Sequence, residues 1–225
     1  MAVTDQNLYN ELQMHLLETE NSGASFGSGL YTVAEMVART NYRLDLFNAL
    51  TGVRVTYNAS QNATTGVKGQ DISTAAPDMI NPLYVFYSSN AGTTYYMLPK
   101  GSSLEADMYI TTQTAVTLPS HYTLDSARTL GINLFPAPTF TGSNGKINLA
   151  YIPKVGTLPA TPDGTGLSIP DDFTPFIKYG VLADLFRKSG ETYDPVRAEI
   201  CEQLFSLGVE VTKGWLSGSV TPVQQ

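Results

Sequence analysis

Apolar residues recur at helical spacing near the C-terminal end of the chain. Between Phe173 and Leu185 they fall three and four residues apart, in a row that only the charged Asp184 interrupts. Such a row lies on one side of a helix and faces a core. Asp171 and Asp172 stand at its start, where free backbone N–H groups and the helix dipole favour carboxylates. The pattern predicts a helix that begins near Asp172.

A second helix follows after a short turn. Asp194 is a favoured N-cap residue, and Pro195 fits the first helical position because its missing N–H needs no partner there. Apolar residues then recur every three to four positions, at Val196, Ile200, Leu204, Leu207 or Gly208, Val211 and Trp215. Two helices joined by so short a turn should pack antiparallel as a helical hairpin.

Two further helices are predicted near the N-terminus. The first runs from about Asp5 to Glu18, with leucines on one side. The second begins at a capping box formed by Thr32 and Glu35 and stops at Gly52. Its predicted buried face comprises Val33, Met36, Val37, Leu44, Phe47 and Leu50.

The hydrophobic period changes to that of strands between residues 53 and 168. Short alternating or apolar runs predict strands at Val53–Tyr57, Leu83–Tyr87, Thr93–Leu98, Ala115–Leu118, Tyr122–Leu124, Ile132–Phe135 and Ile147–Ile152. Asn90-Ala91-Gly92 predicts a hairpin between the second and third of these runs. Residues 58–77 are expected to form a polar loop, and residues 104–109 a short helical turn.

These elements predict an α+β chain. We expect a four-helix core, made of two N-terminal helices in residues 1–52 and two C-terminal helices in residues 169–216. A β-rich insertion of antiparallel hairpins is expected in residues 53–168. Residues 217–225 are polar and contain Gly and Pro, and we expect them to form a flexible tail.

Composition favours an assembly protein over a nucleic-acid binder. The chain has 225 residues, a net charge of −7, and only 15% charged residues, compared with about 25% in typical soluble domains. Charge is depleted at the cores of protein–protein interfaces, whereas nucleic-acid binders need a basic surface. The chain has no apolar run of about 18 residues, so we expect no membrane span. With no secretory signal in view, we expect synthesis in a cytoplasm.

The first predicted helix offers one candidate metal face. Glu11, His15 and Glu18 are spaced four and three residues apart, and carboxylate and imidazole groups at such positions can bind zinc. A metal-dependent hydrolase using His15 is therefore one hypothesis. The alternative is an ordinary solvated face opposite the leucines, and we favour it because polar faces of this kind are common.

Other candidate groups favour structural roles. His121 has no catalytic partner nearby in the sequence, and Cys201, on an apolar helix, is expected to be a core or near-core thiol. Asp171 and Asp172 could be paired catalytic carboxylates, but their position at a helix start already accounts for them. We therefore expect no catalytic, cofactor-binding or metal-binding residues, no cofactor and no enzymatic activity.

Loop and aromatic motifs leave one binding hypothesis open. Residues 142–147 are too short for a phosphate-binding P-loop, and the sequons at Asn58 and Asn62 are expected to be plain loop residues. Five aromatic residues could form a stacking platform for a sugar or single-stranded nucleic acid, namely Tyr84, Phe86, Tyr87, Tyr95 and Tyr96. Pairing and burial within a hairpin is the interpretation we favour.

Several segments resemble those of tailed-bacteriophage virion proteins described as head–tail adaptors (connectors) or as structural proteins. The similar segments are residues 169–185, Tyr193–Ala198, Gly208–Glu210, Leu134–Pro138, Gly145–Pro153 and Tyr31–Met36. They are structural rather than catalytic motifs and follow one another over most of the chain. Residues 58–82 lie outside the resemblance.

The resemblance implies a subunit of a homo-oligomeric ring, expected to be a dodecamer, in the virion neck at the head–tail junction. Such a ring links the portal protein to the tail or nozzle protein and extends the DNA-exit channel. DNA would pass through without sequence-specific binding, which suits an acidic chain because basic contacts would retard it. The alternative hypothesis is a tail component that binds host-surface carbohydrate or a receptor.

Overall fold

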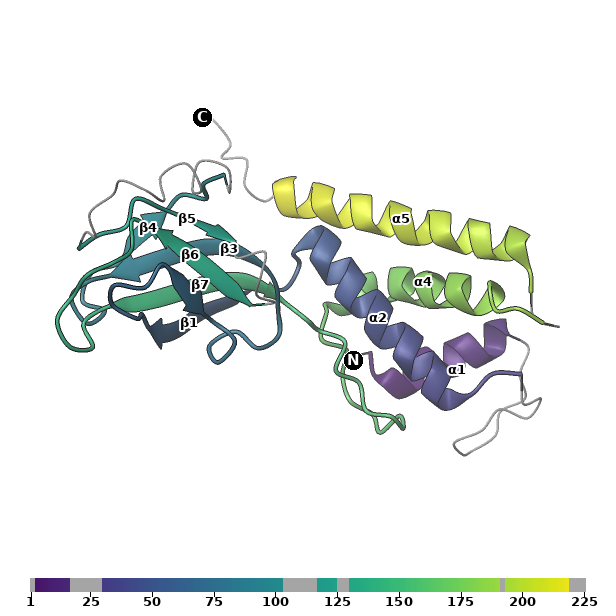
Figure 1. Cartoon of the computed structure of the whole chain (residues 1–225). Coiled ribbons are helices and arrows are strands. Elements are labelled where there is room, and N and C mark those ends of the chain that lie inside the picture. Colours follow the sequence, from purple (N-terminus) through teal and green to yellow (C-terminus); the bar gives the residue numbers. More distant parts are fainter. Residues whose placement is uncertain (1–2, 17–29, 103–116, 125–129, 191–192, 219–225) are drawn as a thin grey trace. The chain divides into compact units, whose positions relative to one another are not determined.

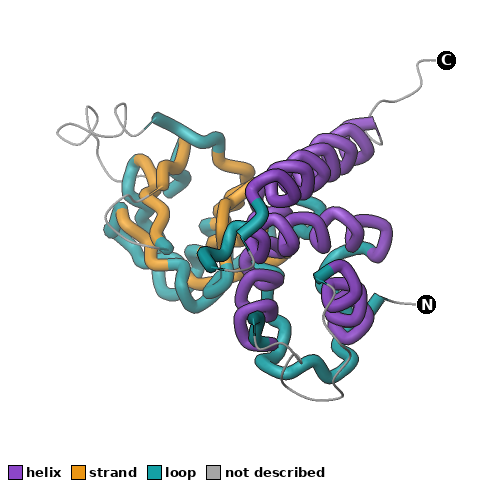
Figure 2. The backbone as a smooth tube through the Cα atoms, turned by 90° about the vertical axis from the view of Figure 1, so that its right-hand side faces the viewer, coloured by secondary structure: helices purple, strands orange, loops and turns teal. Residues whose placement is uncertain are grey.

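The computed structural model describes residues 3–16, 30–102, 117–124, 130–190 and 193–218. The chain divides into two compact units, one made of Met1–Arg54 and Lys154–Gln225, the other of Val55–Pro153. The helices gather in the first unit and the strands in the second (Figures 1 and 2). We call them the helical unit and the β unit.

Local capping signals explain where the helices of the helical unit begin and end. Thr32 caps the second helix by accepting a hydrogen bond from the Glu35 N–H at 3.1 Å, and Gly52 ends it in the left-handed conformation. Asp194 caps the last helix through the Arg197 N–H at 3.0 Å. The helices are α1 (Asp5–His15), α2 (Val33–Thr51), α4 (Thr174–Phe186) and α5 (Pro195–Gly218), with the 3₁₀ turn η1 (Asp171–Phe173) before α4.

The helices do not form the predicted four-helix core. Helix α4 is the central element: α2 and α5 pack on it and on each other, and α1 packs mainly on α4. Buried residues lie on every side of α4, including Ile177, Val181, Leu182 and Leu185, and a helix that is apolar all round is enclosed by its neighbours. Non-helical residues such as Val155 complete the same core. The sequence pattern showed only one row of apolar residues on α4. It therefore predicted one buried face, as in a symmetric four-helix bundle.

The described strands of the β unit form two antiparallel sheets. This arrangement differs from the predicted insertion of hairpins. The strands are β1 (Thr56–Asn62), β2 (Gly69–Asp71), β3 (Met79–Ser88), β4 (Tyr96–Leu98), β5 (His121–Leu124), β6 (Gly131–Phe135) and β7 (Lys146–Pro153). One sheet has the order β1-β7-β3-β4 and the other β2-β6-β5. Among these pairs, only β3–β4 and β5–β6 join consecutive strands, so most of the pairing is between distant segments.

Several strand predictions need correction. The predicted strand at residues 53–57 starts only at Thr56, and the predicted polar loop of residues 58–77 contains the rest of β1 and all of β2. The predicted strands at 132–135 and 147–152 exist but belong to different sheets. The hairpin around Asn90 is confirmed, since Val85 pairs with Leu98. The predicted helical turn at 104–109 lies outside the described residues, as do residues 115 and 116.

Polar side chains of α2 fix both chain segments through which the helical unit connects to the β unit. The Asp45 carboxylate accepts hydrogen bonds from the N–H groups of Val155 and Gly156, each at 2.7 Å. Asn48 accepts from the Arg54 N–H at 2.8 Å and donates to its carbonyl at 3.2 Å. These carboxylate and amide groups therefore act within the helical unit as anchors for its connecting segments.

Helix α5 is longer than the sequence predicted. It continues to Gly218, so the first two residues of the predicted tail, Ser217 and Gly218, are helical. Residues 219–225 lie outside the described part of the chain. No helix within the described ranges is long and apolar enough to cross a membrane.

Candidate interaction surface on the helical unit

Helix α5 carries two apolar rows, and only one of them faces the core. The buried residues are Ala198, Cys201, Phe205, Gly208, Val209 and Thr212. Helices α4 and α5 lie side by side (Figure 1), and Gly208 lets them approach closely because a Cβ at this position would overlap the Phe176 ring. The predicted helical hairpin is confirmed. However, α5 packs on α4 through the buried row just named, not through the row of apolar residues from Val196 to Trp215 that predicted the helix.

The second row of α5 lies at the surface. Trp215 is 61% exposed, Leu207 56% and Val211 50%. We call the exposed α5 row Val196, Ile200, Leu207, Val211 and Trp215; Leu204, from the same pattern, is half-buried. Five such side chains expose apolar area on the order of 500 Å², near the top of the roughly 300–600 Å² typical of a monomer's largest patch. A patch of this size indicates a protein–protein contact.

A buried arginine on α2 sets the rotation of α5. Arg43 is 3% exposed, and its guanidinium donates to two carboxylates at once. It bonds Asp184 of α4, from Nε at 2.8 Å, and both carboxylate oxygens of Glu202 of α5, at 2.9 and 2.8 Å. Its planar group also lies over the Phe205 ring, 4.9 Å from the centroid. This clamp joins three helices and turns the Glu202 side of α5 toward α2.

The clamp explains the charged interruption in the apolar row of α4, which the sequence left unassigned. Asp184 and Glu202 together supply the paired carboxylates that a bidentate arginine prefers. Burial by itself would lower the pKa of Arg43, but the hydrogen bonds to Asp184 and Glu202 outweigh it and raise that pKa above its ordinary value. The hydrogen bond from Arg43 lowers the pKa of Glu202, although burial opposes it. Arg43 and Glu202 are therefore charged at neutral pH.

The clamp was not predicted from the sequence because Arg43 lies more than 140 positions before both of its partners, Asp184 and Glu202. One signal could have indicated it: an arginine and an aspartate each lie within an apolar helical row. A buried charge of this kind requires a partner.

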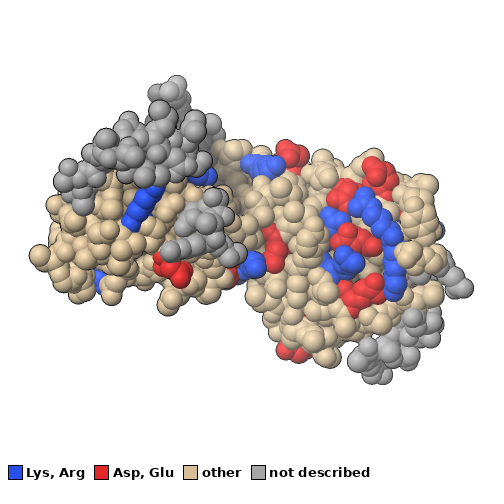
Figure 3. All heavy atoms as spheres, viewed as in Figure 1, with Lys and Arg blue, Asp and Glu red and all other residues tan. Residues whose placement is uncertain are grey.

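Figure 3 shows Lys, Arg, Asp and Glu side chains interspersed on the helical unit, with few charged side chains on the visible face of the β unit.

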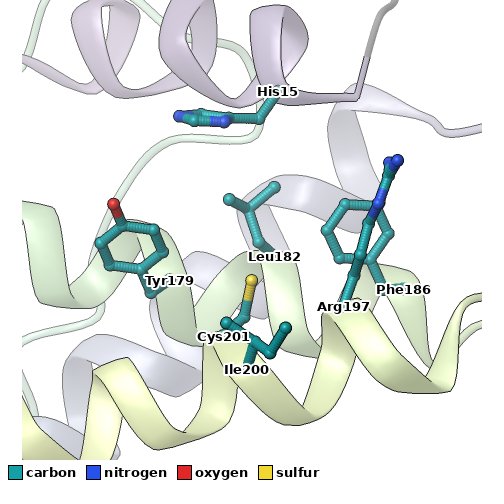
Figure 4. Close-up of a pocket in the computed structure, with 7 residues that line it drawn as sticks. All are labelled: His15, Tyr179, Leu182, Phe186, Arg197, Ile200 and Cys201. Atoms are coloured by element: carbon teal, nitrogen blue, oxygen red, sulfur yellow. The ribbon is translucent and has the colours of Figure 1, made fainter.

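A small pocket lies beside the N-terminal half of the exposed α5 row. It has a volume of about 230 Å³ and is lined by His15 of α1, Tyr179, Leu182 and Phe186 of α4, and Arg197, Ile200 and Cys201 of α5 (Figure 4). Small-molecule sites usually measure about 300–1,000 Å³. This pocket is smaller than that, and a second pocket of about 300 Å³ shares His15, Phe186 and Arg197 with it.

Two of the three residues of the candidate metal face of α1 lie within the described part of the chain. Glu11 forms an ion pair with Lys178 at 2.9 Å, His15 lines the pocket, and Glu18 lies outside the described residues. No group of three His, Cys, Asp or Glu side chains in the described ranges could hold a metal ion.

The other candidate groups have structural surroundings. Cys201 is buried as predicted, and burial raises the pKa of its thiol, so it is a poor nucleophile. His121 stacks on Phe135, with ring centroids 5.2 Å apart, and its Nδ1 lies 2.9 Å from the Ser120 hydroxyl. Asp171 accepts a hydrogen bond from the Val3 N–H at 3.1 Å. Asp171 and Asp172 both lie in η1, immediately before α4.

The five aromatic residues of the β3–β4 region do not form one platform. Tyr87 is fully buried, whereas Tyr84 and Tyr96 are about half exposed. Tyr84 and Phe86 share a face of β3, with ring centroids 6.4 Å apart. Because side chains alternate along a strand, the aromatic residues divide between the two faces of the sheet. Of the glycine-containing segment at 142–147, residues 142–145 precede β7, and Lys146 and Ile147 belong to that strand.

Comparison with protein families gives a match over most of the chain. Residues 31–220 match the family model described as SU10 adaptor protein. A search of curated proteins finds no match. The matched range contains α2, all strands of the β unit, α4 and α5, and therefore both the clamp and the exposed α5 row.

Proposed function

Because the chain belongs to the SU10 adaptor protein family, we propose that this phage structural protein is the subunit of a head-to-tail adaptor ring. The ring lies in the virion neck, links the portal protein to the tail or nozzle protein, and extends the channel through which DNA leaves the head. Its action depends on shape and interfaces rather than on catalysis. The exposed α5 row is the observation that carries this proposal.

An adaptor needs an apolar surface that is unpartnered in the free subunit and covered in the assembly. The exposed α5 row has this property, since its five side chains are half or more exposed on a helix whose other apolar row is buried. One edge of the row is partly covered, because the Trp215 ring packs edge-on against Phe173, with centroids 5.9 Å apart. Burial of such a row is favourable by about 25 cal/mol per Å² of apolar area. A rigid helix also loses little conformational freedom when it docks.

The charge of the chain agrees with a channel role. A net charge of −7 disfavours retention of DNA, because binding to phosphates depends on Lys and Arg contacts. The charged side chains that the clamp uses are paired with one another. They support the fold of the subunit.

The position of the protein in the particle tests the proposal. A tagged copy would be located in purified virions by gold labelling and electron microscopy. We expect a ring of label at the head–tail junction, and we expect the purified protein to assemble on isolated portal. Label at the tail tip would refute the neck assignment and favour the alternative host-binding function.

A further inference from the structure

A closed ring needs two different surfaces on each subunit, because each copy contacts one neighbour on either side. The exposed α5 row is one such surface. The other must lie elsewhere on the subunit, facing away from the first. This step rests on the proposed ring function.

The clamp fixes the direction in which the exposed α5 row points. Glu202 faces α2 because it is bonded to Arg43. Successive helical residues turn by about 100°, so Ile200, Leu207, Val211 and Trp215 point roughly 140–220° away from Glu202. The exposed α5 row therefore lies on the side of α5 turned away from α2.

Helix α2 has an exposed side of its own, centred on Tyr42, which is 56% exposed. We call the exposed α2 row Ala34, Ala38, Tyr42 and Ala49, all of them exposed. By the same 100° rule they point roughly 100–180° away from Arg43. The exposed rows of α2 and α5 are thus turned away from each other, on opposite sides of the clamp.

We propose that in the assembled ring the exposed α5 row of one copy packs against the exposed α2 row of the next copy. The rows match in length, at roughly 22 Å for α2 and 28 Å for α5 from a rise of 1.5 Å per residue. They also match in shape, since the large side chains of α5 face three alanines that permit close approach of the helix axes. The α5 row supplies on the order of 500 Å² toward the roughly 800 Å² per partner of a standard interface.

Cross-linking between two single-cysteine variants tests this contact. Cys201 is the chain's one cysteine, so a Cys201→Ala background allows new cysteines at Ala38 and Val211 on separate copies. Rings would be formed on portal from each variant alone and from an equal mixture, then treated with a short bismaleimide. We expect linked dimers in the mixture only, and only after ring formation.

Met14→Cys is the matched control, because Met14 is 69% exposed and lies on α1, outside both rows. A mixture of Met14→Cys with Val211→Cys should remain unlinked. Linked dimers from Val211→Cys alone would show that α5 pairs with α5 and would overturn the proposal. Rings that form without linkage in the Ala38–Val211 mixture would overturn it while leaving the adaptor function intact. Failure of all variants and of the unmodified protein to form rings on portal would refute both.

Discussion

At the scale of single residues, the guanidinium group of Arg43 organises the helical unit. A buried charge is tolerated only with well-placed partners, and Arg43 has two carboxylates and an aromatic ring around it. Together with the close approach of α4 at Gly208, the geometry of this group sets which row of α5 is buried and which is exposed. The consequence for function is indirect, because Arg43 positions a surface without belonging to it.

Replacing Arg43 by alanine should destabilise the helical unit strongly. The substitution leaves Asp184 and Glu202 without their shared partner, and removing one member of a buried ion pair typically costs about 3–5 kcal/mol. Urea unfolding followed by the fluorescence of Trp215, the chain's one tryptophan, would measure the change. Arg39→Ala is the control, since Arg39 is an exposed residue of the same helix and should change stability by less than about 0.5 kcal/mol. Equal effects of both variants would contradict the role of the clamp.

The lowered pKa of Glu202 makes a prediction about acid stability. A carboxyl group whose pKa is lower in the folded state stabilises the fold above its ordinary pKa of 4.5 and loses this contribution as the pH falls through the folded value. The unmodified protein should therefore lose stability below pH 4.5 more steeply than Glu202→Gln, which has no proton to bind there. Urea midpoints measured from neutral pH downward would compare the two slopes. Parallel curves would show that Glu202 does not contribute to acid unfolding.

At the scale of elements, Gly208 and Gly214 of α5 occupy contrasting environments. A side chain at Gly208 would overlap Phe176, whereas a Cβ added at Gly214 would meet no neighbouring side chain or other element within 4 Å. Gly208→Ala should destabilise by about 1–3 kcal/mol through overpacking. Gly214→Ala should stabilise by up to about 1 kcal/mol, because alanine has the higher helix propensity. Thermal unfolding of both variants would check the opposite signs, and a loss of stability in Gly214→Ala would refute this account of α5.

The exposed α5 row should matter for assembly but not for folding. Leu207→Glu places a charge in the surface that we propose is covered in the ring, whereas Ser206→Glu adds the same charge one position away on the polar side of α5. We expect Leu207→Glu to weaken assembly on portal about a hundredfold or more, as at a hot spot of about 2–3 kcal/mol. Ser206→Glu should assemble normally. Circular dichroism would confirm that both variants fold, and equal assembly of the two would remove the exposed α5 row from the interface.

The start of α2, its end at Gly52 and the start of α5 were predictable from the sequence because capping is local, whereas the end of α5 was not. Thr32, Gly52 and Asp194 act through residues within four positions along the chain. The buried side of α5 was not predictable, because Val209 and Val211 belong to two apolar rows of similar strength. Contacts with other helices decide between them, with Arg43 of α2 through Glu202 and with Phe176 of α4 at Gly208.

At the scale of the whole molecule, sheet pairing was the part least accessible from sequence. Strand β7 lies between β1 and β3, and such partners are chosen by burial across distant segments rather than by turn residues. The one hairpin that was correctly predicted, β3–β4, is set by the local turn at Asn90. The same distinction applies to the interaction surface. The apolar spacing of the exposed α5 row can be found in the sequence, whereas its exposure depends on how α5 packs in the fold.

The two units have separate hydrophobic cores, and this predicts separate unfolding. One core contains residues such as Leu44, Phe47 and Ile177, and the other contains Val85, Ile147 and Leu149. Arg43→Ala should therefore lower the urea midpoint reported by Trp215 of the helical unit, while amide hydrogen exchange in β3 and β7 of the β unit stays unchanged.

Leu149→Ala is the matched substitution in the β core. It should accelerate amide hydrogen exchange in β3 and β7 and leave the Trp215 midpoint unchanged, at a cost of about 2–5 kcal/mol to the β unit alone. Exchange that accelerates in both units in either variant would show one cooperative fold. If the two units unfold independently, the helical unit presents its exposed α5 row even when the β unit is unfolded. Substitutions in the β unit could then alter its surface without weakening the ring contact.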